Sequence, residues 1–178
     1  MEGIEHRLWL AREVWILSRT CTRLWEDYNE QLMRLLSYEE AVVRIMMVDP
    51  NDGAVKMIVG AAEGFEHTAD LDLRRATIED LLRQLTKLRS RLKAKNLQVR
   101  TIDYLPAWTL VMIDPLSDKG TIYAELATFR ANSRNRPTLS LDAERDGRLF
   151  QVFRAEFEAM WERARSIDAP GFTEIAVQ

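Results

Sequence analysis

Strand-like and helix-like segments alternate in the first half of the chain, whereas strand-like segments follow one another in the second half. Short apolar runs rich in β-branched residues indicate buried strands, and apolar residues that recur every three or four positions indicate helices. Strands separated by helices become parallel neighbours, and strands joined by short turns become antiparallel ones. The sequence therefore predicts an α/β fold in which a mixed β-sheet is flanked by helices.

Six segments have the length and composition of strands, namely residues 13–18, 41–48, 97–104, 108–114, 121–126 and 138–141. Helices are predicted over residues 4–11, from Thr22 onward, over 54–62, over 73–95 and over about 147–165, whereas residues 64–72 have the composition of a polar loop. Asp118, Lys119 and Gly120 favour a hairpin turn, which predicts that the fourth and fifth strands pair with each other.

A chain of 178 residues is long enough for one domain with a substantial core. We expect residues 1–167 to form that domain and residues 168–178 to form a flexible C-terminal tail. No apolar run approaches the roughly 20 residues that span a bilayer, and the first residues lack a signal-peptide pattern, so we expect a cytoplasmic protein. The net charge of −3 argues against a large nucleic-acid footprint unless the charges are unevenly distributed. Cys21, the single cysteine, is expected to be a small buried hydrophobe.

A short apolar strand that ends in an acid, Leu-Pro-Ala-Trp-Thr-Leu-Val-Met-Ile-Asp, lies at residues 105–114. This strand and its neighbours resemble one half of the phospholipase D superfamily fold, and the resemblance covers most of the chain. More narrowly, the chain is similar to an uncharacterised bacterial group of phospholipase D-like domains that lack the catalytic motif. The segments that carry the resemblance are residues 43–50, 105–114, 121–126, 136–141 and 153–164. The resemblance implies a phospholipase D-like half-domain.

In active members of this superfamily, the strand holds the motif His-x-Lys-x-x-x-x-Asp, whose His attacks phosphorus and whose Lys stabilises the phosphoryl charge. Asp114 matches the Asp, but Ala107 stands in place of the His and Thr109 in place of the Lys. Covalent phosphoryl transfer needs an activated nucleophile. The resemblance therefore implies a domain that is not an enzyme and that acts as a sensor or regulatory module. It also implies a homodimer, because members with a single motif pair about a two-fold axis.

The densest cluster of polar residues follows the fifth predicted strand, and in active relatives the equivalent segment borders the phosphate pocket. Arginine forks with Asn and Ser donors suit a phosphate or a carboxylate, although the same composition is typical of a solvated basic loop. Trp108 could line such a pocket or pack in the core. The predicted ligand-binding residues are Trp108, Asp114, Glu125, Arg130, Asn132, Ser133, Arg134 and Arg136. The expected ligand is a phosphate-bearing small molecule or nucleotide, and a protein partner is the alternative; no cofactor is expected.

Two other functions remain open at this point. Asp49 and Asp114 each end a predicted strand, so parallel neighbouring strands would bring both acids to one edge of the sheet. With Glu125, they would then suit a metal-dependent phosphohydrolase or nuclease. Both acids are followed by proline, however, and Asp-Pro pairs also favour turns. The third hypothesis is a purely structural dimerisation module.

Overall fold

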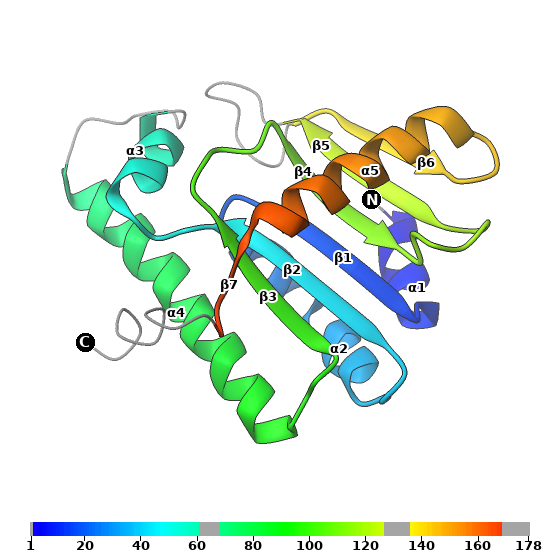
Figure 1. Cartoon of the computed structure of the whole chain (residues 1–178), viewed down its shortest axis with the longest axis horizontal. Helices are drawn as coiled ribbons and strands as arrows, with labels where there is room; N and C mark the ends of the chain where they lie inside the picture. Colours follow the sequence, from blue (N-terminus) through cyan, green and yellow to red (C-terminus); the bar gives the residue numbers. More distant parts are fainter. Residues whose placement is uncertain (1, 61–67, 127–135, 169–178) are drawn as a thin grey trace.

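A seven-stranded mixed sheet forms the centre of the molecule, with the strand order β6-β5-β4-β1-β2-β3-β7 (Figure 1). The computed structural model describes residues 2–60, 68–126 and 136–168. The strands are β1 (Glu13–Ser18), β2 (Val42–Val48), β3 (Leu97–Ile102), β4 (Trp108–Ile113), β5 (Thr121–Leu126), β6 (Thr138–Asp142) and β7 (Arg165–Ser166). The first three strands are parallel, and every other pairing in the sheet is antiparallel. The predicted α/β class with a mixed sheet is therefore confirmed.

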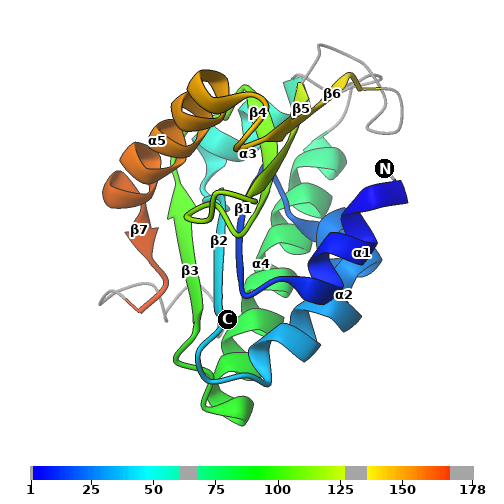
Figure 2. The same ribbon diagram turned by 90° about the vertical axis from the view of Figure 1, so that its right-hand side faces the viewer.

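Helices cover both faces of this sheet (Figure 2). The helices are α1 (Glu2–Leu10), α2 (Thr22–Leu36), α3 (Asp52–Gly60), α4 (Thr68–Leu92) and α5 (Gly147–Arg163). Helices α1, α2 and α4 lie on one face, and α5 crosses the other face alone. Helix α3 packs against α4. Among the described residues, no helix is long and apolar enough to cross a membrane.

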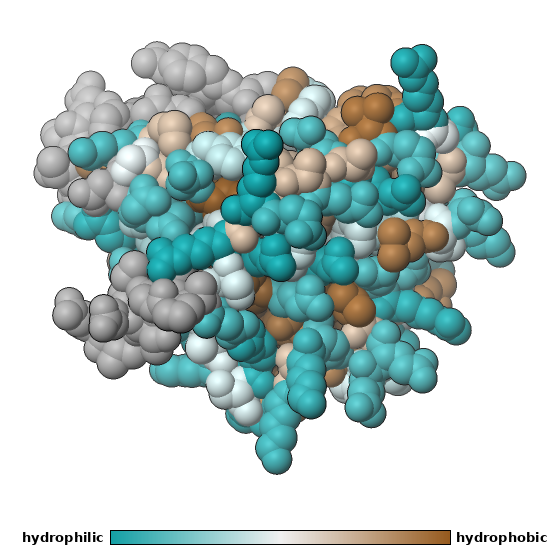
Figure 3. Space-filling model, viewed as in Figure 1, coloured by the Kyte–Doolittle hydropathy of each residue, from teal (hydrophilic) through white to brown (hydrophobic). Residues whose placement is uncertain are grey.

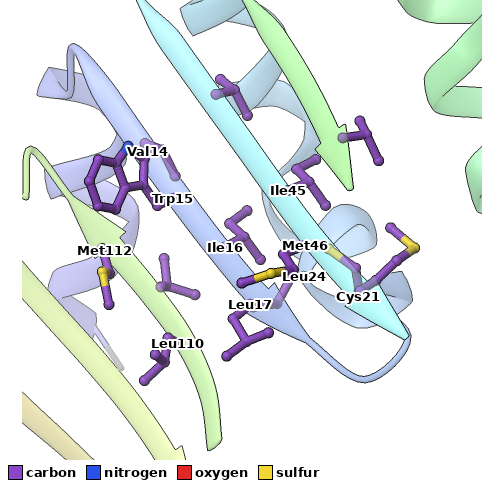
Figure 4. Close-up of a cluster of buried hydrophobic side chains, with 14 of the residues drawn as sticks. Val14, Trp15, Ile16, Leu17, Cys21, Leu24, Ile45, Met46, Leu110 and Met112 are labelled. Carbon is purple, nitrogen blue, oxygen red and sulfur yellow. The ribbon is translucent and has the colours of Figure 1, made fainter. Parts of the chain in front are cut away.

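The aromatic stripe of α5 explains how a single helix can cover its face of the sheet. Phe150, Phe153, Phe157 and Trp161 are all buried, and Phe157 stacks between Trp15 and Trp161 with ring centroids 5.1 and 5.8 Å away. Aromatic side chains bury a large apolar area each, so four of them on one helix cover much of this face of the sheet. Figure 4 shows the adjoining part of the core, where Trp15 and Leu17 of β1 lie beside Met112 and Leu110 of β4.

Several predicted boundaries differ from those of the structure, and tertiary contacts explain two of the differences. Residues 68–72 were predicted as loop, but they form the first turn of α4, and Leu71 packs against the core there. Arg165 was predicted as the end of the last helix, but Ala164 is extended (φ −69°, ψ 143°), and the next two residues pair with Arg100 and Thr101 as β7. In both places a tertiary contact determines the backbone conformation, and such a contact cannot be predicted from the neighbouring residues in the sequence.

The direction of β4 determines which side chains can meet. Strand β4 is antiparallel to β1, and β5 is antiparallel to β4, so β5 runs in the same direction as β1. The ends of β1, β2, β3 and β5 therefore share one edge with the starts of β4 and β6. We call this the carboxyl edge. Asp114, which follows the last residue of β4, lies at the opposite edge.

At that opposite edge, Asp114 fastens β4 to the start of β1. Its Oδ1 atom accepts hydrogen bonds from the backbone N–H groups of Arg12 and Glu13, both at 2.8 Å. Its own N–H donates to the carbonyl oxygen of Glu13 at 2.8 Å. The backbone of Asp114 is left-handed (φ 47°), a conformation that Asp and Asn tolerate better than most residues. This carboxylate is therefore structural.

Side chains close the second half of the free edge of the sheet at β6. The backbone N–H groups of Ala143 and Leu126 donate to the carbonyl oxygens of Gly120 and Pro137. In this pattern, the backbone N–H and C=O groups of the odd-numbered residues of β6 bond to β5, and those of the even-numbered residues face away from the sheet. On the outward side, Arg145 donates to the Ser140 carbonyl oxygen at 2.7 Å. Asp146 accepts from the Asp142 N–H at 2.9 Å. Arg145 and Asp146 also form an ion pair at 2.7 Å, and this pair lowers the pKa of Asp146.

We expect Asp114→Ala to lower the free energy of unfolding by about 2 kcal/mol, because two charge-assisted hydrogen bonds are lost and Ala is strained in a left-handed backbone. Asp114→Asn should lose less, since it keeps an oxygen acceptor and tolerates that backbone. Urea denaturation would measure both. Asp118→Ala, at an exposed acid of the same loop, is the control; an Asp114→Ala variant as stable as this control would contradict the structural role.

Candidate functional site

Three arginines and one glutamate meet at the carboxyl edge, on the face that α2 covers. Arg19 directly follows β1, Arg23 lies in the first turn of α2, Glu125 belongs to β5, and Arg136 precedes β6. We call these four residues the guanidinium cluster. They come from four places in the sequence, and only the directions of β1 and β5 bring them together.

Glu125 is the centre of the guanidinium cluster. Its side chain is 8% exposed, and its Oε2 atom lies 2.6 Å from Nη2 of Arg23. Its Oε1 atom lies 3.1 Å from Nη1 of Arg136, whose side chain is 18% exposed. Glu125 therefore uses one oxygen for each of two guanidinium groups, and its charge is shared between them.

Arg19 is the third cation, and it has the least favourable surroundings. Burial lowers the pKa of Arg19, the nearby Arg136 lowers it further, and Glu125 opposes both effects in part. The Nε atoms of Arg19 and of Arg136 are buried and have no hydrogen-bond partner. Three cations against one carboxylate leave two positive charges in excess, and buried donors without an acceptor are costly. The arrangement is therefore suited to an additional anion.

The start of α2 adds to this positive potential. Cys21 occupies the N-cap position with a left-handed backbone (φ 59°) and makes no side-chain cap, and the first turn contains no acidic residue. The N-terminus of a helix carries a partial positive charge, so Arg23 in that turn adds a cation where an anion would be favoured. Cys21 is not a nucleophile for this site, because burial raises the pKa of its thiol to about 12.

The guanidinium cluster contains only part of the predicted ligand-binding set. Glu125 and Arg136 lie together, as their closeness in sequence indicated. Asp114 is at the opposite edge of the sheet, bound to the start of β1, so the prediction that it shares their site was wrong. Arg130, Asn132, Ser133 and Arg134 lie outside the described residues.

Trp108 lies at the carboxyl edge but on the other face of the sheet. Thr109 pairs directly with Glu125, and successive strand residues point to opposite faces, so Trp108 points toward α5. Its ring meets Phe153 edge-to-face, with centroids 5.2 Å apart. The core-packing alternative is therefore correct for Trp108, and its assignment to the ligand site was wrong.

The hypothesis of a metal site at Asp49, Asp114 and Glu125 is also wrong. Asp114 lies at the opposite edge, because β4 is antiparallel to β1. Strands β4 and β1 separate β5 from β2, which places Glu125 about 14 Å from Asp49 at roughly 4.8 Å per strand. Asp49 accepts hydrogen bonds from the Thr101 hydroxyl and the Asn51 N–H, as expected of a turn-forming acid. Within the described ranges, no three His, Cys, Asp or Glu residues lie close enough to hold a metal ion.

Sequence reasoning missed Arg19 and Arg23, although both carried a signal. Arg19 directly follows a buried strand at the edge where open α/β sheets bind ligands. Arg23 is a cation in the first turn of a predicted helix, where the helix dipole disfavours it by some tenths of a kcal/mol. A basic residue in that position does not stabilise its own helix, so it indicates an interaction of the cation with another group.

No protein-family model matches the chain, and no curated protein matches it by sequence. The arrangement of the described residues must therefore carry the functional argument.

We expect Glu125→Gln to lower the free energy of unfolding by about 2–3 kcal/mol, because it removes the single negative charge from three neighbouring guanidinium groups. The loss should be smaller at high salt, since salt screens the repulsion that remains. Urea denaturation at two salt concentrations would measure it, with Glu144→Gln, an exposed acid, as control. A loss that matches the control at both concentrations would show that the guanidinium cluster does not depend on Glu125.

Proposed function

We propose that this chain is a non-catalytic, phospholipase D-like domain that binds a phosphate-bearing ligand at the guanidinium cluster and acts as a sensor or regulatory module. The observation that carries the proposal is the charge imbalance: Arg19, Arg23 and Arg136 share one carboxylate, and two of their Nε donors are buried without an acceptor. A phosphate group supplies both the missing negative charge and several acceptor oxygens.

The position of the guanidinium cluster supports the phospholipase D-like interpretation. Thr109, which stands in place of the motif's Lys, is paired with Glu125. Ala107, in place of the His, is two residues earlier along the same stretch of chain. The cluster therefore lies beside the positions at which an active relative would hold its catalytic pair. In this proposal, the cations that bind phosphate are kept while the nucleophile that would attack it is missing.

The choice of phosphate over carboxylate follows from the geometry of the donors. The cations come from three separate segments, so they approach the site from different directions. A tetrahedral phosphate presents oxygens in several directions at once, whereas a carboxylate presents two in one plane and is satisfied by a single arginine fork. The homodimer that the resemblance implies stays a prediction.

We expect Arg19→Gln to weaken the binding of inorganic phosphate and of adenosine monophosphate by about tenfold or more, since a charge-assisted hydrogen bond contributes roughly 1.5–3 kcal/mol. The melting temperature should barely change, because Glu125 keeps both of its ion pairs with Arg23 and Arg136. Titration calorimetry would measure the binding. Arg12→Gln, an exposed arginine at the opposite edge, is the matched control and should bind as the wild type does. Equal affinity in both variants would refute the site.

We also expect the protein to hydrolyse bis-p-nitrophenyl phosphate and phospholipids no faster than buffer does. Ala107 and Thr109 provide neither nucleophile nor cation, and the Cys21 thiol stays protonated at neutral pH. A continuous absorbance assay would test the first substrate. The sequence has two histidines, His6 and His67. Activity that survives a chelator and is abolished by His67→Ala would mean that His67 acts as a displaced nucleophile, and that the domain is an enzyme.

A further inference from the structure

The basic residues are unevenly distributed, and one stretch of the chain holds no acid at all. Residues 81–102 contain seven basic residues and no acidic one, although the whole chain has a net charge of −3. The seven are Arg83, Lys87, Arg89, Arg91, Lys93, Lys95 and Arg100. This stretch covers the C-terminal half of α4 and all of β3. It lies toward the edge of the sheet where β3 begins, away from the carboxyl edge.

A groove runs between the end of α4, the start of β3 and β7. It has a volume of about 640 Å³, and its charged lining residues are Arg89, Lys93, Lys95, Arg100 and Asp168. Asp168 is paired with Arg89 through two guanidinium nitrogens, so among the described lining residues Lys93, Lys95 and Arg100 have no second acid beside them. Arg100 is held in place because its guanidinium lies 4.7 Å from the Trp161 ring centroid.

The outward face of α4 extends this positive surface beyond the groove. Arg83, Lys87 and Arg91 recur every four residues, so at 1.5 Å per residue they lie about 6 Å apart along the helix. Only Arg83 has an acidic neighbour on the helix, with Asp80 3.6 Å away. Figure 3 shows the α5 side of the molecule, where hydrophilic side chains predominate at the lower end, near the end of α4. The groove and the helix face together form what we call the basic surface.

The composition of the basic surface limits the kind of partner it can bind. Among the described residues that line its groove, none is aromatic, and the apolar ones, Ala94, Leu97 and Val99, are buried. Leu92 is a large apolar side chain exposed nearby, at 42%. Protein interfaces depend on buried aromatic and aliphatic anchors, which these residues do not supply. Binding to a phosphodiester backbone needs regularly placed cations and no apolar anchor.

We propose that the basic surface binds the phosphate backbone of duplex nucleic acid without reading its sequence. The groove and the helix face both offer cations, and among the described residues neither offers exposed aromatic rings for stacking on unpaired bases. Cations also stabilise the C-terminus of a helix, which is a structural reason for Lys93. That reason does not extend to Arg83, Lys87 or Arg100. The proposal is independent of the phosphate site, which lies at the other edge of the sheet.

Fluorescence anisotropy of a labelled duplex of about 20 base pairs would test the proposal, with titrations between 50 and 200 mM salt. The double variant Lys93→Asn, Lys95→Gln removes two charges from the groove, and Asn suits the left-handed backbone of Lys93 (φ 51°). We expect it to weaken binding at least tenfold at low salt and to reduce the slope of log affinity against log salt by about 2. The control Lys119→Gln, Arg148→Gln removes two exposed charges elsewhere and should leave the slope unchanged.

Three results would overturn the proposal: no duplex binding by the wild type at 50 mM salt, equal losses in the two double variants, or tighter binding of polyglutamate than of duplex at equal charge. The last result would assign the surface to an acidic protein. Thermal melting of each variant separates lost binding from lost structure, and Arg19→Gln should bind duplex as the wild type does.

Discussion

The antiparallel pairing of β4 with β1 is the constraint on which the rest of the structure depends. Each parallel strand before it needs a helix to return the chain to the same edge, whereas β4 enters the sheet from the opposite direction. Asp114 fixes this reversal, because its carboxylate binds the first N–H groups of β1 at the point where β4 ends. The direction of β5 follows from that of β4, and it brings Glu125 to the start of α2.

The two opposite edges of the sheet also differ in how their positive charges are held. At the carboxyl edge, the buried carboxylate of Glu125 holds Arg23 and Arg136 together, although their guanidinium groups repel each other. Arg19 lies nearby, and neither of these two ion pairs includes it. At the other edge, most cations of the basic surface are exposed and less constrained, namely Lys87, Arg91, Lys93 and Lys95, whereas Arg89 and Arg100 are held by Asp168 and Trp161. Buried cations with few degrees of freedom favour a small ligand of fixed shape, whereas exposed ones favour a long polyanion that can slide. One acidic chain can thus present two separate positive regions of different character.

The local pattern of apolar and turn-forming residues was enough to predict most of the helices and strands. It failed where a contact with a residue far away in the sequence determines the conformation. Residues 13–18 and 121–126 were predicted as strands with the boundaries that the structure has, because apolar side chains and turn residues delimit them. β7 was missed because its two residues are a strand only by pairing with β3. Glu125 and Arg136 were found as candidates by their closeness in sequence. Asp114 was assigned to the wrong edge because the direction of β4 cannot be predicted from the sequence. Arg19 and Arg23 were missed because they lie about 100 residues before Glu125, and no nearby residue indicates that contact.

The side chains of Arg145 and Asp146 limit how this molecule can grow. An open outer strand offers a template on which another chain can add a strand, and such additions lead to aggregates or to continuous sheets across two subunits. Here the Ser140 carbonyl and the Asp142 N–H are already occupied by a charged pair from the same chain. A strand approaching that half of β6 would have to displace both charges and find them new partners. Growth by strand addition is therefore obstructed at that half of β6, and a two-fold assembly that extended the sheet across it would first have to break contacts that the folded chain already makes.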